Sequence, residues 1–163
     1  NGFTIYEGDD NGLVVYQIQF FKEGEEKPYV INSRYDPKDL ENIKIYTGLR
    51  QDLIKSELYI TMEPTLSGKA TIAFSEINKY LENPFLFNLP TFPGLLREVE
   101  GNNLPKVSCE DVSESRSVIE FKIGEKNEIY EDNDCIILEA LNEDELIRVA
   151  DRLSLTMLGI MKH

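Results

Sequence analysis

Carboxylates are the commonest chemically active side chains in this sequence, and two short runs of them could hold a metal ion. One run is Asp9 and Asp10; the other is Glu131, Asp132 and Asp134. Carboxylate oxygens beside a sharp turn are typical calcium ligands. In the first run, however, an EF-hand spacing would require an acid within residues 13–21, and none occurs there. Asn11-Gly12, directly after the first run, predicts a hairpin turn, which is the simpler interpretation there. Calcium remains a candidate ligand at both runs.

Cys109 and Cys135 are the only cysteines and lie 26 positions apart. In an oxidising compartment they would pair, and closing this loop would stabilise the fold by about 3 kcal/mol. In a reducing compartment they would be two buried thiols. Two cysteines without a histidine make a poor metal site. We favour the disulfide, and the reduced pair remains the alternative.

The loop at residues 63–71 stands between a predicted strand and a predicted helix, where phosphate-binding loops occur. A Walker A loop needs GxxxxGK[ST], but Glu63 occupies the first glycine position and Ala70 follows Lys69. Nucleotide hydrolysis is therefore disfavoured. We predict a capped helix start, with weak anion contact through the helix N-terminus and Lys69 as the remaining alternative.

Other catalytic groups are scarce. The single histidine, His163, is the last residue, so histidine-dependent triads and histidine-ligated zinc sites are nearly excluded. The serines lack a GxSxG context. A glycosidase-like carboxylate pair meets only in space, and among 30 acids the spacing does not identify one. We therefore predict no catalytic residue and no cofactor other than calcium.

Charge restricts the partners. The chain carries 17 basic and 30 acidic residues, a net charge of −13, which repels nucleic acid and anionic membrane surfaces. Residues 125–145 hold nine of the acids and one base. This window is a solvated edge, or else a site for calcium or a basic partner.

No run of about 18 apolar residues occurs, so no transmembrane segment is predicted within the chain. The sequence starts at Asn1 without a methionine and shows no signal peptide. We expect residues 1–163 to form a single domain excised from a longer protein.

The elements that would position these residues are clearest at the C-terminus. An apolar strand at 135–141 leads into a long helix with Asn142 as N-cap and Glu145 completing a capping box. Leu141 and Leu146 have the spacing of a hydrophobic staple, and Gly159 is a plausible C-cap. Apolar residues then recur at three- and four-residue steps from 146 to 158, which predicts one buried stripe.

The remaining elements give an α/β class, with α+β as the alternative. Strands are predicted at 3–6, 13–21 and 29–32, forming an antiparallel β-meander. Asp36-Pro37 predicts a short helix, followed by a strand at 43–46 and a helix at 48–55. A strand at 58–62, a helix at 69–81 and a strand at 85–87 suggest a parallel crossover. Residues 89–94 read as a loop and 95–99 as a short helix, with strands at 107–112, 118–123 and 128–130.

Two segments resemble extracytoplasmic domains of uncharacterised archaeal surface or membrane-anchored proteins. They are residues 29–37, YVINSRYDP, and the C-terminal set Asp134–Ile137, Ala150–Leu153 and Leu158–Ile160. The resemblance covers the two ends of the chain and is structural, not catalytic. It implies a Cys109–Cys135 disulfide and a location outside the cytoplasm, and it implies no activity.

The sequence thus favours a non-enzymatic, soluble ectodomain that acts through protein contacts or surface assembly, with other protein surfaces as partners. The first alternative is a cation- or small-molecule-binding module that uses the acidic 125–145 region. The second is a carboxylate-based hydrolase, which would need a cleft where two acids converge with perturbed pKa values.

Overall fold

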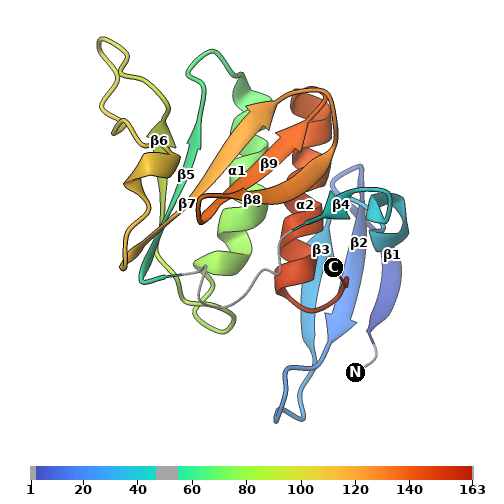
Figure 1. The fold of residues 1–163 in the computed structure, drawn as a ribbon. Helices are drawn as coiled ribbons and strands as arrows, with labels where there is room; N and C mark the ends of the chain where they lie inside the picture. The colour runs from blue at the N-terminus through green and yellow to red at the C-terminus, as the bar shows by residue number, and fades with distance from the viewer. Residues whose placement is uncertain (1–2, 47–54, 163) are drawn as a thin grey trace.

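The computed structural model describes residues 3–46 and 55–162 and shows a mixed α/β protein. It contains a three-stranded sheet, a six-stranded sheet and two long helices (Figure 1). The predicted fold class is therefore confirmed, including the N-terminal meander, the strand–helix–strand unit and the C-terminal strand and helix. The helix expected at 48–55 lies almost entirely outside the described residues.

The N-terminal sheet is an antiparallel meander of β1 (Thr4–Asp10), β2 (Leu13–Phe20) and β3 (Tyr29–Ser33). Asn11 and Gly12 form the β1–β2 turn with φ of 54° and 85°, as the Asn-Gly dipeptide predicts. Ile18 and Ile31 pair across β2 and β3 and are both buried, so this face of the meander joins the main core.

The larger sheet is mixed, with strand order β4-β8-β9-β7-β5-β6. Its strands are β4 (Lys44–Ile45), β5 (Glu57–Met62), β6 (Thr91–Leu95), β7 (Arg116–Ile123), β8 (Glu128–Asp132) and β9 (Cys135–Ala140). Strands β6, β5, β7 and β9 are mutually parallel, whereas β8 returns antiparallel to β9. Ile119, Phe121, Ile136 and Leu138 alternate along β7 and β9 toward the core.

Helices α1 (Gly68–Leu81) and α2 (Glu143–Met157) pack against each other on one side of this sheet (Figure 1). Helix α2 also contacts η1 (Pro37–Leu40) and lies between the sheet and the meander, so nearly all its residues from Leu146 to Thr156 are buried. The sequence predicts a single buried stripe on α2, but neighbouring elements cover most of the helix surface, so the buried part of the helix is wider than predicted.

The caps of α2 are partly as predicted. The Asn142 side chain accepts a hydrogen bond from the Glu145 amide at 2.9 Å, and Gly159 follows the helix with a φ of 74°. The Glu145 carboxylate, however, binds Asn127 and Arg148. Leu141 is 51% exposed, so it does not staple the helix entry.

The strand predicted at 85–87 is wrong: Phe85 to Phe87 lie in a turn, and the crossover strand is β6 at Thr91–Leu95. Proline and glycine in that segment favour a loop on sequence grounds. Among the described strands β6 pairs with β5 alone, and its outer edge makes one bridge, from Leu95 to Lys106, so Pro93 sits on an edge strand, where its missing N–H costs no ladder bond. The short helix predicted at 95–99 is also wrong, because Leu95 ends β6.

The strand predicted at 107–112 is replaced by a 3₁₀ turn, η3 (Cys109–Asp111). Ser108 caps this turn, its side chain accepting from the Glu110 amide, while Asp111 accepts from the Ser108 amide at 2.8 Å. Ser-x-x-Asp is a capping-box spacing, and here it outweighs the apolar residues Val107 and Val112. Cys109 therefore lies on a turn that packs over the sheet.

Candidate functional site

The face of the large sheet opposite the helices carries a second, smaller apolar cluster. Val107, Val118, Cys135 and Ile137 are buried in it, and Tyr59, Cys109, Val112 and Tyr130 pack around them. The segment between β6 and β7 covers this part of the face. The Thr61 hydroxyl fixes that segment by donating to the Val107 carbonyl at 2.7 Å.

Cys109 and Cys135 form a disulfide in this cluster, with their Cα atoms 5.3 Å apart. The pairing predicted from the sequence is confirmed. Its two ends differ in burial, because Cys135 on β9 is 0% exposed whereas Cys109 on η3 is partly exposed. The bond joins the loop over the sheet to a central strand.

Glu120 on β7 lies beside this disulfide, with its Oε2 atom 3.2 Å from the Cys109 sulfur. Burial raises the pKa of the Glu120 carboxyl, and the negative charges of Glu63 and Asp132 add to this, while Lys122 acts in the opposite direction. Among the described residues, Cys109, Glu120 and Cys135 form the one group with metal-ligand chemistry and spacing. Because both sulfurs are in the disulfide, this group is not a clear metal site.

A cavity of about 390 Å³ opens at the carboxyl ends of β5 and β7. Its walls combine apolar and charged side chains: Glu63, Thr65, Leu66, Leu96, Glu120, Phe121, Lys122 and Ile123. The carboxyl ends of parallel strands are where α/β sheets commonly bind ligands. Arg97 pairs with Glu63 at 3.1 Å, whereas Glu120 has its nearest polar contact with the sulfur of Cys109.

A polar cluster continues along the same face beyond the cavity. The Tyr130 hydroxyl donates to Glu139 at 3.0 Å, and Lys122 lies 3.3 Å from that hydroxyl. The Glu125 amide also donates to Glu139 and is the main cause of its lowered pKa. Gly124 makes this possible, since a Cβ atom there would lie 2.1 Å from a Glu139 oxygen.

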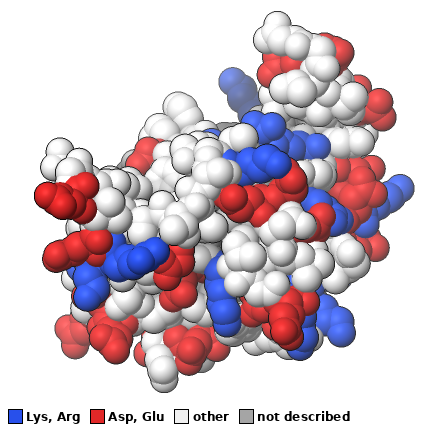
Figure 2. Space-filling view, turned by 90° about the horizontal axis from the view of Figure 1, so that it is seen from above, with Lys and Arg blue, Asp and Glu red and all other residues white. Residues whose placement is uncertain are grey.

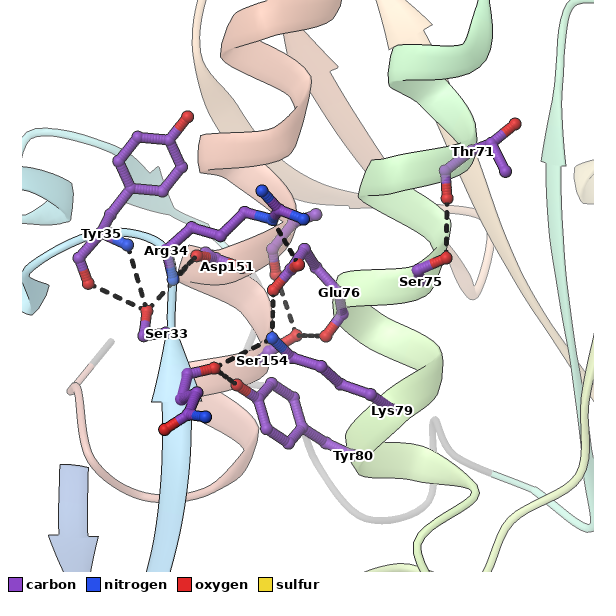
Figure 3. Close-up of polar contacts among 12 residues, drawn as sticks. Ser33, Arg34, Tyr35, Thr71, Ser75, Glu76, Lys79, Tyr80, Asp151 and Ser154 are labelled. Carbon is purple, nitrogen blue, oxygen red and sulfur yellow. Dashed lines mark hydrogen bonds and ion pairs between the residues drawn. The ribbon is translucent and has the colours of Figure 1, made fainter. Parts of the chain in front are cut away.

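Another group of polar residues is buried between β3, α1 and α2 (Figure 3). Glu76 is 4% exposed and Asp151 is 1% exposed. Arg34 donates to Glu76 at 2.6 Å, and Lys79 also pairs with that carboxylate. Asp151 accepts from the Arg34 amide and the Ser33 hydroxyl, each at 3.3 Å. This acid pair therefore ties the meander to both helices.

The two acids of this pair have pKa values shifted in opposite directions. Burial raises the pKa of Asp151 well above its ordinary value, and the neighbouring Glu76 carboxylate raises it further. Burial opposes ionisation of Glu76 too, but Lys79, Asp151 and Arg34 outweigh it and lower its pKa. Without a proton, Asp151 would leave Oδ1 unpaired, whereas a protonated Asp151 donates to Glu76. The hydrogen bonds and ion pairs of the two acids join β3, α1 and α2, so the pair holds the fold together.

The anion contact considered for the start of α1 is already made within the chain. The Ser67 amide and hydroxyl both donate to the Glu143 carboxylate, the hydroxyl at 2.8 Å. Lys69 pairs with Asp144 at 2.7 Å. Figure 2 looks onto the end where both helices begin and shows acidic and basic side chains interspersed there.

The carboxylates singled out as calcium candidates lie in two different sheets. Asp9 and Asp10 flank the β1–β2 turn, where Asp9 accepts from the Gly12 amide at 2.8 Å and Asp10 from the Asn11 side chain at 3.1 Å. The other three lie at the β8–β9 turn: Glu131, Asp132 and Asp134. The metal-type group found in the described residues contains none of these five acids. Calcium binding stays a prediction.

The sequence does not predict Glu76, Glu120 or Asp151 as site residues. The pKa of each of these carboxyl groups is shifted by burial or by neighbouring charges. Glu76 and Asp151 interrupt otherwise ordinary helical patterns, and only the crossing of β3 over the helices buries them. Glu120 did carry a signal, because it stands between Ile119 and Phe121 in an apolar strand. A carboxyl group in that position faces the other side of the sheet.

Comparisons with family models, with curated proteins and with solved structures find no match to this chain. Of the helices in residues 3–46 and 55–162, none is both long enough and apolar enough to span a membrane.

Proposed function

We propose that this chain is a binding module of an extracytoplasmic protein and acts by holding another protein. The supporting observation is the disulfide between Cys109 and Cys135, because such bonds persist in oxidising compartments and are rare in the cytosol. The resemblance of residues 29–37 and of the C-terminal segments to archaeal surface proteins points the same way.

The surface that best suits a protein partner carries three exposed phenylalanines and is here called the phenylalanine surface. Phe3 (42% exposed) and Phe21 (47%) line one groove, and Phe85 (66%) is joined to it through Lys22. Lys22 donates to the Phe85 carbonyl, which joins the β2–β3 turn to the α1–β6 loop. Exposed aromatic groups of this kind are typical of protein interfaces.

A groove of about 370 Å³ runs beside this surface and is lined by Phe3, Phe20, Phe21, Lys22, Glu23, Leu158, Gly159 and Ile160. The adjoining β2–β3 turn adds the exposed acids Glu26 and Glu25, of which Glu25 pairs with Lys22 at 3.6 Å. This chemistry fits an apolar side chain flanked by lysine or arginine. The net charge of −13 opposes pairing with a second copy. The proposed partner is therefore a different protein with a basic surface.

Photo-crosslinking in the cells that make the protein tests this proposal. A photoreactive phenylalanine analogue at Phe85 is expected to crosslink one protein whose crosslinked peptide contains basic residues. The same analogue at Phe92, 40% exposed on edge strand β6, is the control and is expected to give none. Equal crosslinking at both positions, or none at Phe85, would overturn the proposal.

A second candidate function is the binding of a small organic cation, supported by the cavity at the ends of β5 and β7. Glu120 lines that cavity, and among the described residues no lysine or arginine forms an ion pair with it, so an ammonium group could pair with it. Thermal melts with millimolar primary amines, and separately with calcium, test this function. A rise in Tm that Glu120→Gln abolishes supports it, and an unchanged Tm contradicts it.

A further inference from the structure

We infer that the Cys109–Cys135 disulfide exchanges with thiols, with Cys109 as the sulfur under attack and Glu120 as the proton carrier. This inference is independent of the phenylalanine surface. It rests on the unequal burial of the two cysteines and on the position of one carboxyl group between them and the cavity.

The burial of the cysteines sets the direction of attack. Cys135 is 0% exposed and packs among Val107, Val118 and Ile137, so an incoming thiol cannot reach its sulfur without displacing the cluster. Cys109 is partly exposed on the short turn η3. A thiolate must attack one sulfur and expel the other. Attack at Cys109 makes Cys135 the leaving group.

A leaving thiolate at Cys135 would be a buried charge in apolar surroundings, which is costly unless it is neutralised. Glu120 is the acid placed to neutralise it. Its Oε2 is 3.2 Å from the Cys109 sulfur, and its ligand atom lies within 4.8 Å of both sulfurs. Burial also raises the pKa of Glu120, which keeps more of it protonated.

The exchange proceeds in two steps. An external thiolate, from a small dithiol or a protein dithiol, forms a bond to the Cys109 sulfur while the Cys109–Cys135 bond breaks. The electron pair goes to the Cys135 sulfur, which takes the proton of Glu120 and becomes a thiol. The Cys135 sulfur lies 3.5 Å from the Val118 carbonyl, which can accept its S–H bond. The second thiol of the reductant, as its thiolate, then attacks the mixed disulfide. The reductant leaves as a disulfide and Cys109 becomes a thiol after taking a solvent proton.

Reduction kinetics with dithiothreitol test this assignment, using rates divided by the thiolate concentration at each pH. The normalised rate for the wild-type protein should fall as pH rises through the pKa of Glu120. Glu120→Gln should give a flat profile that lies about tenfold or more below the wild type at the acidic end. Glu63→Gln, a carboxylate change in the same cavity, is the matched control: it should keep the wild-type rate at the acidic end, and its rate should fall at a lower pH, because the Glu63 charge adds to the raised pKa of Glu120.

The reduction rates at the acidic end of the pH profile distinguish proton transfer by Glu120 from electrostatic repulsion between Glu120 and the incoming thiolate. If Glu120 only repels the thiolate, Glu120→Gln will match or exceed the wild-type rate there, and the proposal is overturned. Should Glu120→Gln not fold, Glu120→Asp moves the carboxyl back by one methylene and should also be slower. The trapped mixed disulfide of a monothiol should map to Cys109, and mapping to Cys135 would also overturn the inference.

Discussion

Glu76 on α1 and Asp151 on α2 face each other in the interior and form one acid pair, in which the pKa of Asp151 is raised and the pKa of Glu76 is lowered. Both are at least 95% shielded from solvent. The pair connects three elements that are far apart in the chain, because Arg34 of the segment after β3 reaches both acids. Its protonation should therefore be visible in the stability of the whole fold.

Stability should fall as pH rises, because of Asp151. Its pKa is raised on folding, so the folded state binds more protons than the unfolded chain above the ordinary value of 3.8. The free energy of unfolding should decrease by up to about 1.4 kcal/mol per pH unit until the raised pKa is passed. Asp151→Asn, which keeps a donor, should lose this slope in urea melts. An identical slope in both proteins would contradict the assignment.

Removing the charge of Glu76 should destabilise the protein in the opposite pH range. Its pKa is lowered on folding, so its contribution is present above the ordinary value of 4.5 and is lost as pH falls. Arg34 and Lys79 are partly solvated, so we expect Glu76→Gln to cost about 2 kcal/mol at pH 7, not the larger cost of a fully buried pair. Denaturant unfolding at pH 7 measures this cost, and a loss under about 0.5 kcal/mol would contradict the expectation.

Gly124 should not tolerate a side chain. A methyl group there would overlap the Glu139 carboxylate and break its bonds to Tyr130 and the Glu125 amide. Gly124→Ala should cost about 1–2 kcal/mol. Gly68→Ala is the matched control, since nothing lies within 4 Å of its added Cβ, and it should be neutral or stabilising by up to about 1 kcal/mol. Equal effects of the two changes on Tm would contradict the geometry.

The disulfide should contribute substantially to stability. Closing a 26-residue separation is worth about 3.5 kcal/mol by the chain-entropy estimate. Reduction should therefore lower Tm, and Cys109→Ala/Cys135→Ala should melt at a similarly lowered temperature with or without reductant. An unchanged Tm on reduction of the wild type would show that the loop is held by other contacts.

The elements that could be predicted from the sequence are those in which local signals agree. Asn11-Gly12, the alternation in β2 and the cap of α2 all specify the structure that forms. The strand β6 could not be found, because Pro93 and Gly94 are acceptable only on an edge that pairs with β5. The position of this edge depends on the strand order, which local patterns do not contain.

The candidate sites likewise include some features that the sequence predicts and others that only the tertiary fold creates. The cysteine pairing could be predicted because two residues admit one pairing, although the apolar residues around Cys109 predict a strand and Cys109 lies on the turn η3. The acid pair could not, because Glu76 and Asp151 become buried only when residues 33–34 pack beside both helices. Acid-rich runs, by contrast, were conspicuous in the sequence but lie at turns.

The state of the two cysteines in protein taken directly from the cells that make it tests the extracytoplasmic proposal most directly. The protein is alkylated without reduction, digested and mapped by mass spectrometry. We predict a cross-linked peptide pair containing Cys109 and Cys135 and no alkylated cysteine. Alkylation of both residues in freshly isolated protein would contradict the proposal.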